Sequence, residues 1–173
     1  MNLQQLERLN QDTIFEVYTD INTPEDFYVG YIKEVYNKFV MLESYNREAE
    51  FNGFRFLRNT DIFKIQKDTQ YLSQYLNTVF PRNHSQSFSL KDGGMLEVLE
   101  WCEKYNKLIE LITIWEDEIV GTIESLEEGL VIINAFSPED FKQDGQCIID
   151  NTDIIEVSMD TKQLKFVASN TSK

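Results

Sequence analysis

The stretch Val29-Gly30-Tyr31-Ile32 recurs as Val120-Gly121-Thr122-Ile123, and each copy opens a segment with the same order of features. The first segment closes on Asn59-Thr60-Asp61-Ile62, and the second closes on Asn151-Thr152-Asp153-Ile154. Between these ends, each copy has a short turn, an apolar run and a loop that contains a glycine. This repetition indicates a tandem duplication of one structural unit.

The repeated unit has the composition of a small, bent β-sheet. β-branched and aromatic residues dominate five short segments of each copy, which predicts five strands. A glycine within a strand costs packing and conformational entropy, so Gly30 and Gly121 predict a bulge or sharp bend. Apolar residues at helical spacing precede both copies, at 3–9 and 95–102. The fold class is therefore predicted as mainly β with short helices (α+β), with a helix and a five-stranded, bent antiparallel barrel occurring twice.

The domain boundaries follow from the duplication. We expect a first helix-plus-barrel repeat over residues 1–79, a linker over 80–94 and a second repeat over 95–173. Pro, Ser and Asn without periodicity, followed by Gly93-Gly94, mark the linker. Asp68 is a candidate helix N-cap before apolar residues at helical spacing. The tail at 164–168 fits either a strand or a helix, and residues 169–173 are expected to fray.

The order of a glycine strand, a turn and a hydrophobic strand, from Gly30-Tyr31-Ile32 to Phe39-Val40-Met41-Leu42, is similar to the first signature of the Sm proteins. The unit resembles the small barrels of the Sm-like or SH3-like kind over about residues 14–72 and 108–164. The resemblance implies a second signature with a basic, glycine-containing turn that helps bind RNA. The matching positions are 59–62 and 151–154, which carry aspartate instead. The RNA function is therefore not carried over.

Charge is distributed unevenly along the chain, whose net charge is −14. Residues 1–90 carry 12 acidic and 9 basic residues, whereas residues 91–173 carry 18 and 7. All five arginines lie in the first part. Phosphate neutralisation requires clustered Lys and Arg, so the second part disfavours nucleic acid. A basic protein partner fits this distribution, although acidity for solubility alone would also produce it.

We therefore predict a non-enzymatic protein-interaction module, such as an acidic adaptor, inhibitor or immunity-type protein that binds a basic partner. Its surface would lie on the second copy, where we expect acidic residues on neighbouring turns. The candidate partner-binding residues are Glu116, Asp117, Glu118, Glu124, Glu127 and Glu128.

The alternative is a single-stranded nucleic-acid-binding, Sm-like module in the first copy, because aromatic rings beside basic groups bind bases by stacking. Glu34, Glu43 and other acids interrupt this basic field. The rings are Tyr28, Tyr31, Tyr36, Tyr45, Phe54 and Phe56, and the basic groups are Lys33, Lys38, Arg47, Arg55 and Arg58.

Metal, cofactor and catalytic roles find little support in the sequence. The run 115–118 offers carboxylates but lacks the alternating ligands and the glycine of a cation loop. His84 is the only histidine and lies in the predicted linker. Asp61 and Asp153 are more simply explained by Asx-turns than by a carboxylate pair. We expect no enzyme activity, no cofactor and no metal.

The expected environment is the cytoplasm. No apolar run approaches the ~20 residues that cross a bilayer, and the start Met1-Asn2-Leu3 lacks a basic region with a long apolar core. Cys102 and Cys147 are expected as buried thiols, because neither a CxxC motif nor a histidine pair is near them.

Overall fold

The computed structural model describes residues 1–9, 12–76, 88, 90, 94–115 and 117–171 of the 173-residue chain. The protein is mainly β with short helices, as predicted. The helices are α1 (Leu3–Leu6), α2 (Ser73–Leu76), α3 (Met95–Lys104) and α4 (Lys162–Thr171), and a 3-10 turn covers Asn151–Asp153. The strands are β1 (Ile14–Tyr18), β2 (Tyr28–Val35), β3 (Phe39–Tyr45), β4 (Phe51–Arg58), β5 (Lys64–Gln66), β6 (Leu108–Thr113), β7 (Glu118–Glu127), β8 (Leu130–Phe136), β9 (Gln143–Asp150) and β10 (Ile154–Met159).

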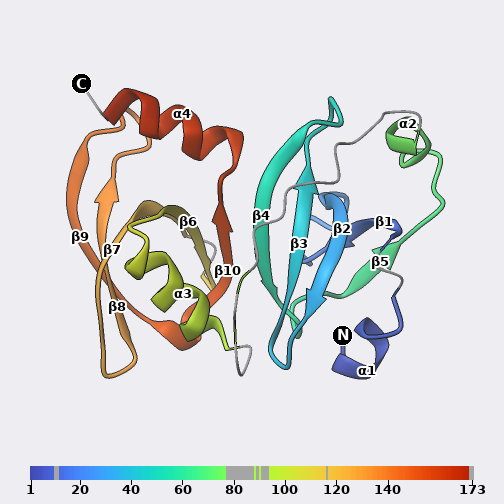
Figure 1. Ribbon diagram of the computed structural model, residues 1–173, viewed down its shortest axis with the longest axis horizontal. Coiled ribbons are helices and arrows are strands. Elements are labelled where there is room, and N and C mark those ends of the chain that lie inside the picture. Colours follow the sequence, from blue (N-terminus) through green and yellow to red (C-terminus); the bar gives the residue numbers. More distant parts are fainter. Residues whose placement is uncertain (10–11, 77–87, 89, 91–93, 116, 172–173) are drawn as a thin grey trace.

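The ten strands form one antiparallel sheet in the order β5-β1-β2-β3-β4-β10-β6-β7-β8-β9 (Figure 1). Both halves use the same internal order, with the fifth strand beside the first. The fourth strand, β4, pairs with β10 of the other half, so that Leu57 lies opposite Glu156 and Phe54 opposite Met159. The sheet is therefore continuous and does not close, so the two five-stranded barrels predicted from the sequence are not confirmed.

The backbone repeats in detail between the halves. Asn59 N–H donates to the carbonyl of Lys38, and Asn151 N–H donates to the carbonyl of Gly129, each at 2.9 Å. Left-handed φ angles also occur at equivalent positions. These pairs are Ala49 and Phe141 (60° and 57°), Gly53 and Gly145 (83° and 78°), and Asp68 and Asp160 (56° and 56°).

Gly30 and Gly121 permit the same close approach of two strands. A side-chain carbon on Gly30 would lie 2.3 Å from the carbonyl oxygen of Glu43, and one on Gly121 would lie 2.5 Å from that of Asn134. The strand register shifts shortly after each glycine, as a β-bulge does. The recurrent glycines thus lie beside β-bulges, one of the two features that the sequence predicted for them.

The two faces of β4 belong to different cores. Leu57 packs with Phe15, Val17 and Ile32 in the core of the first half, under Leu6 of α1. Successive side chains of a strand point to opposite faces, so Phe54 and Phe56 of β4 face the core of the second half. The core of the second half contains, from the first half, Phe39, Met41, Phe54 and Phe56, together with Val98, Leu99 and Cys102 of α3.

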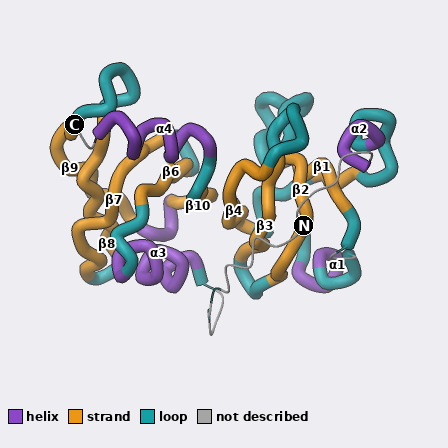
Figure 2. Tube along the Cα trace, turned by 45° about the horizontal axis from the view of Figure 1, so that its top comes forward, coloured by secondary structure: helices purple, strands orange, loops and turns teal. Residues whose placement is uncertain are grey.

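The helices differ from the predictions at their ends. Asp68 is not an N-cap; the following residue, Thr69, accepts a hydrogen bond from Leu72 N–H at 3.1 Å, as Thr161 does from Leu164 N–H at 3.1 Å. The predicted frayed tail is helical as far as Thr171, and α4 lies on the opposite side of the strands from α3 (Figure 2).

Most of the predicted linker lies outside the described residues, so the domain boundaries stay a prediction. Phe88, which is described, packs its ring against Phe54, Phe56 and Trp101.

A candidate interaction site at the joint between the halves

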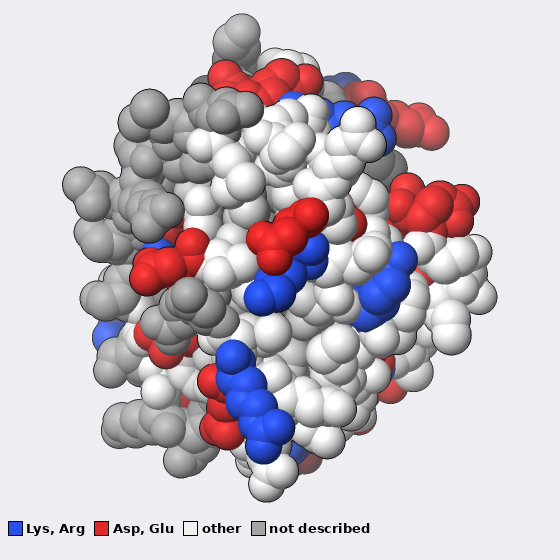
Figure 3. Space-filling model, turned by 90° about the vertical axis from the view of Figure 1, so that its right-hand side faces the viewer, with Lys and Arg blue, Asp and Glu red and all other residues white. Residues whose placement is uncertain are grey.

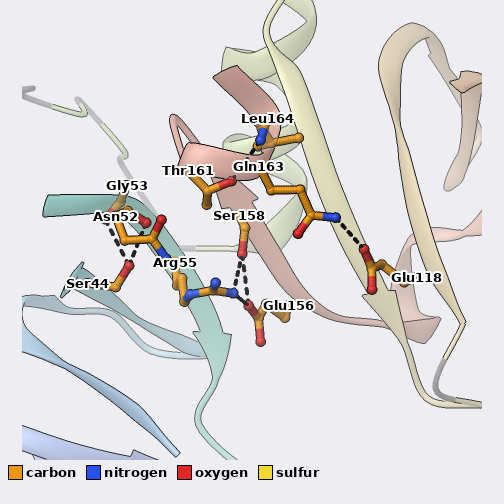
Figure 4. Close-up of polar contacts among 10 residues, drawn as sticks. All are labelled: Ser44, Asn52, Gly53, Arg55, Glu118, Glu156, Ser158, Thr161, Gln163 and Leu164. Carbon is orange, nitrogen blue, oxygen red and sulfur yellow. Dashed lines mark hydrogen bonds and ion pairs between the residues drawn. The ribbon is translucent and has the colours of Figure 1, made fainter. Parts of the chain in front are cut away.

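The two halves meet where β4 pairs with β10, which we call the joint. A buried ion pair connects the halves there. Arg55 Nη1 donates to Glu156 Oε1 at 2.5 Å and to Ser158 Oγ at 2.8 Å (Figure 4). The side chains of Arg55 and Glu156 are only 11% and 4% exposed. The ring of Tyr28 lies 4.2 Å from the centre of the guanidinium group, in cation-π geometry. Strand pairing and charge therefore act together at the joint.

Burial raises the pKa of two titratable groups near this ion pair. Desolvation raises the pKa of Glu110 to about 7, an effect that Arg55 opposes and that the carboxylates of Glu118 and Glu156 increase. Desolvation also raises the pKa of Tyr28 far above its usual value, and the charge of Glu156 raises it further. The joint thus holds a carboxyl group that titrates near neutral pH and a phenol that stays protonated.

A cavity of about 780 Å³ lies beside the ion pair, between the loop after β1 and the strands β6 and β10. We call it the joint groove. Ile21, Phe63 and Ile114 are 75%, 39% and 51% exposed, although large apolar side chains are usually buried. The apolar lining, drawn from both halves, consists of Ile21, Phe27, Phe63, Ile112, Ile114 and Ile155.

Carboxylates outnumber cations along the joint groove. Arg58 is the one described cation that lines it, and its Nε donates to Asp61 Oδ2 at 2.5 Å. Asp20 accepts hydrogen bonds from Thr23 Oγ1 and Asn22 N–H, which lower its pKa. The carboxylates of the lining are Asp20, Asp26, Asp61 and Glu156.

The acidic residues predicted to form one surface do not gather on neighbouring turns. Glu116 lies outside the described residues, and Asp117 precedes β7, whereas Glu127 and Glu128 lie at its far end. A ten-residue strand is roughly 30 Å long. Glu118 accepts a hydrogen bond from Gln163, and Glu124 accepts one from Asn134. Only the Asp117 end is close to the joint groove, because its hairpin also carries Ile114.

The aromatic residues predicted as stacking platforms are mostly part of the cores. Tyr31, Tyr45, Phe54 and Phe56 are at most 6% exposed, so their ring faces are not free for bases. Three of the five basic groups among them form ion pairs. The ion pairs are Lys33 with Glu43, Arg55 with Glu156, and Arg58 with Asp61.

The remaining candidate sites have simple outcomes. Within the described residues, no group of three or more His, Cys, Asp or Glu could hold a metal ion. His84 lies outside those residues. Asp61 forms an ion pair with Arg58 instead of the predicted Asx-turn. In the second half, the Asx role predicted for Asp153 is taken by Asp150, which accepts from Thr152 N–H at 2.8 Å. Among the described helices, none has the length and apolar composition needed to cross a membrane.

Sequence analysis missed the joint groove because its walls come from two distant parts of the chain. Ile21 stands in a segment that has the composition of a turn, and Ile114 ends a strand segment, so neither shows an unusual local pattern. Only the pairing of β4 with β10 brings them together. No protein-family model, curated protein or solved structure matches this chain.

Proposed function

We propose that this protein is a non-enzymatic interaction module that binds a basic, partly apolar segment of another protein in the joint groove. The observation that carries the proposal is the combination, in one cavity, of exposed isoleucine and phenylalanine side chains with an excess of carboxylates. Exposed apolar surface with a polar rim is typical of interaction sites. Acidic rims attract basic partners and raise the rate of association.

The architecture that presents this groove is, in our interpretation, a tandem pair of Sm-like or SH3-like units. The shared strand order and the shared positive φ angles support it. In this interpretation, duplication supplied the site: the groove needs the loop after β1 from one unit and β6 and β10 from the other.

Peptide binding measured by fluorescence anisotropy tests the proposal. Two labelled peptides of equal length are used, one alternating Leu and Lys and the other alternating Leu and Glu. We expect the Leu-Lys peptide to bind more tightly, with an affinity that falls as salt rises. Replacing Ile114→Ser should weaken it about tenfold, which corresponds to about 1.4 kcal/mol.

Two further variants locate the contact. Asp26→Asn removes a charge from the groove, and Glu127→Gln with Glu128→Gln removes two charges from the far end of β7. We expect only the first to weaken binding. A larger effect of the second would move the contact to the β7 surface predicted from the sequence. Tighter binding of a single-stranded oligonucleotide than of either peptide would instead favour the nucleic-acid alternative.

A further inference from the structure

The first half contains another cavity, of about 270 Å³, beside the joint groove. It lies between the loop before β2, the turn between β3 and β4, and the tyrosines around α2, all at one end of the first half (Figure 1). Residues 26–28 form the wall that it shares with the joint groove. We call this cavity the arginine pocket. The lining residues on which the argument depends are Glu25, Asp26, Tyr28, Arg47, Arg55 and Tyr71.

Two arginines of the pocket have hydrogen-bond donors without an acceptor. Both hydrogen bonds of Arg55 are made by Nη1, whereas its Nε is buried and has no partner among the described residues. Arg47 is exposed, and within the described part of the chain it forms neither a hydrogen bond nor an ion pair. A buried donor without an acceptor is unfavourable, and the planar guanidinium group matches a carboxylate. A carboxylate bound in the pocket would satisfy these donors.

Two carboxylates of the pocket lack a cationic partner. Glu25 and Asp26 are exposed, and neither side chain accepts a hydrogen bond or forms an ion pair with a described residue. Figure 3, which faces the end of the molecule that holds α2 and β5, shows acidic and basic side chains next to one another. A phosphate dianion would be repelled by the two carboxylates. A molecule that carries both a carboxylate and an ammonium group would find a partner for each.

Aromatic rings supply the apolar part of the wall. Phe27 and Tyr71 pack edge to face, with ring centroids 5.1 Å apart, and Tyr71 remains 36% exposed. Aromatic rings pack favourably against further rings in offset or edge-to-face geometry. The volume of about 270 Å³ lies just below the range of about 300–1,000 Å³ that is usual for pockets of drug-sized ligands. The pocket therefore fits a small molecule with one aromatic ring.

We propose that the arginine pocket binds a small aromatic zwitterion, of the class of the aromatic amino acids. Its carboxylate would bind Arg47 and Arg55, its ammonium group would bind Glu25 and Asp26, and its ring would pack beside Tyr71. This site adds a small-molecule ligand to the peptide-binding role of the joint groove, and it does not depend on that role.

The fold itself does not require this set of residues. The second half repeats the backbone, but the turn equivalent to that of Arg47 reads Pro138-Glu139-Asp140 and holds no cation. Gln163 stands at the position equivalent to Tyr71. The combination of arginine, carboxylate and aromatic ring is thus particular to the first half.

Titrations followed by NMR chemical shifts test the proposal. The ligands are L-phenylalanine, L-phenylalaninamide, which lacks the carboxylate, and N-acetyl-L-phenylalanine, which lacks the ammonium group. We expect L-phenylalanine to shift the amide signals of residues 44–47 and 71–75, and each derivative to bind at least tenfold more weakly. Absence of shifts at about 10 mM L-phenylalanine, or an equal affinity of either derivative, would overturn the proposal. Tighter binding of inorganic phosphate than of L-phenylalanine would also overturn it, in favour of a simple anion site.

Two substitutions assign the charged groups. Arg47→Gln should weaken L-phenylalanine binding at least tenfold and leave L-phenylalaninamide binding unchanged, because the amide has no carboxylate. Glu25→Gln should weaken L-phenylalanine binding and leave N-acetyl-L-phenylalanine binding unchanged. Both positions are exposed, so neither substitution should unfold the protein. Arg55 is left in place, because it holds the joint together.

The matched controls are Arg8→Gln and Glu7→Gln, at exposed positions beside α1, and both should leave L-phenylalanine binding unchanged. An equal effect of a pocket variant and its control would overturn the location of the site. The Leu-Lys peptide should bind to Arg47→Gln as it binds to the unmodified protein, because Arg47 does not line the joint groove. The two proposals can therefore fail separately.

Discussion

The two halves have the same strand order, but their fourth strands have different neighbours in the sheet. β4 lies inside the sheet, paired on both sides, whereas its equivalent β9 lies at the end. Side chains follow this difference: Arg55 forms a buried ion pair, but the equivalent residue of β9 is Cys147, and the buried Phe56 corresponds to the exposed Ile148. Positions that shape the backbone agree between the halves, and positions that meet a partner strand have diverged. The comparison teaches that the joint, and not the fold of either half, sets these differences.

The largest effect expected from a substitution comes from breaking the ion pair of the joint. Arg55→Met leaves the carboxylate of Glu156 buried without its cation, and loss of one partner of a buried pair costs about 3–5 kcal/mol. Urea unfolding, followed by circular dichroism, measures the loss in the free energy of unfolding.

Two controls separate charge from packing at this position. The double variant Arg55→Met with Glu156→Gln should recover part of the loss, because no unpaired charge remains. Cys147→Ser, at the equivalent position of the other half, should change the free energy of unfolding by less than about 1 kcal/mol. A loss at Cys147 as large as that at Arg55 would contradict the special role of the joint.

Substitution of Gly53 in β4 and of its equivalent Gly145 in β9 is expected to have the next largest effect. Both have positive φ, so alanine at either costs about 1 kcal/mol in backbone strain. At Gly53 the added carbon would also lie 2.2 Å from the carbonyl oxygen of Met159, across the joint, whereas at Gly145 no atom lies within 4 Å. We expect Gly53→Ala to cost about 3 kcal/mol and Gly145→Ala about 1 kcal/mol. The melting temperatures of the two variants measure this difference. Equal decreases would show that the close contact between strands at the joint does not add to the destabilisation.

The recurrent glycines and apolar runs were enough to predict the shared strand pattern, because strand period, bends and turns depend on neighbouring residues. The joint could not be predicted in this way. Arg55 and Glu156 are 101 residues apart, and a charged residue within a strand pattern looks like an exposed one until its partner strand is known. The joint groove could not be predicted for the same reason, because its isoleucines come from segments that are far apart in the sequence. Two separate barrels were predicted because nothing local indicates whether a fourth strand pairs within its own unit or with another.

The third prediction uses the pH dependence of stability to compare two equivalent glutamates. Glu110 has a pKa raised to about 7, so its folded value lies above the unfolded one. The folded state then binds the extra proton between about pH 4.5 and 7, and the stability from the protonated group is lost as pH rises through this window. Glu110→Gln should therefore stabilise the protein at pH 8, by on the order of 2 kcal/mol, and change little at pH 4.5.

The equivalent residue, Glu16, provides the matched control. It accepts hydrogen bonds from the hydroxyl groups of Tyr18, at 2.7 Å, and Thr69. Glu16→Gln exchanges one carboxylate oxygen for a donor, so it should destabilise the protein at both pH values. If Glu110→Gln were destabilising at pH 8, the carboxylate of Glu110 would be favourable in its charged form, and the sign of our argument would be wrong.

The smallest expected effect concerns the surface charges that differ most clearly between the halves. Lys33 Nζ lies 3.4 Å from Glu43 Oε2, and at the equivalent positions Asn134 donates to Glu124 at 2.5 Å. The lysine side chain is 37% exposed, so solvent screens the ion pair, and Lys33→Gln should cost less than about 1 kcal/mol, with the difference shrinking in high salt. Glu124→Gln should have a smaller effect, because the amide oxygen can still accept from Asn134.

Such small changes would mean that opposite charges at equivalent positions are not required by the fold, which leaves solubility or a partner to explain them. A loss of 2 kcal/mol or more in Lys33→Gln would instead mean that the buried Glu43, only 1% exposed, needs its cation to remain in the first half. The divergence in charge between the halves would then be structural at this position.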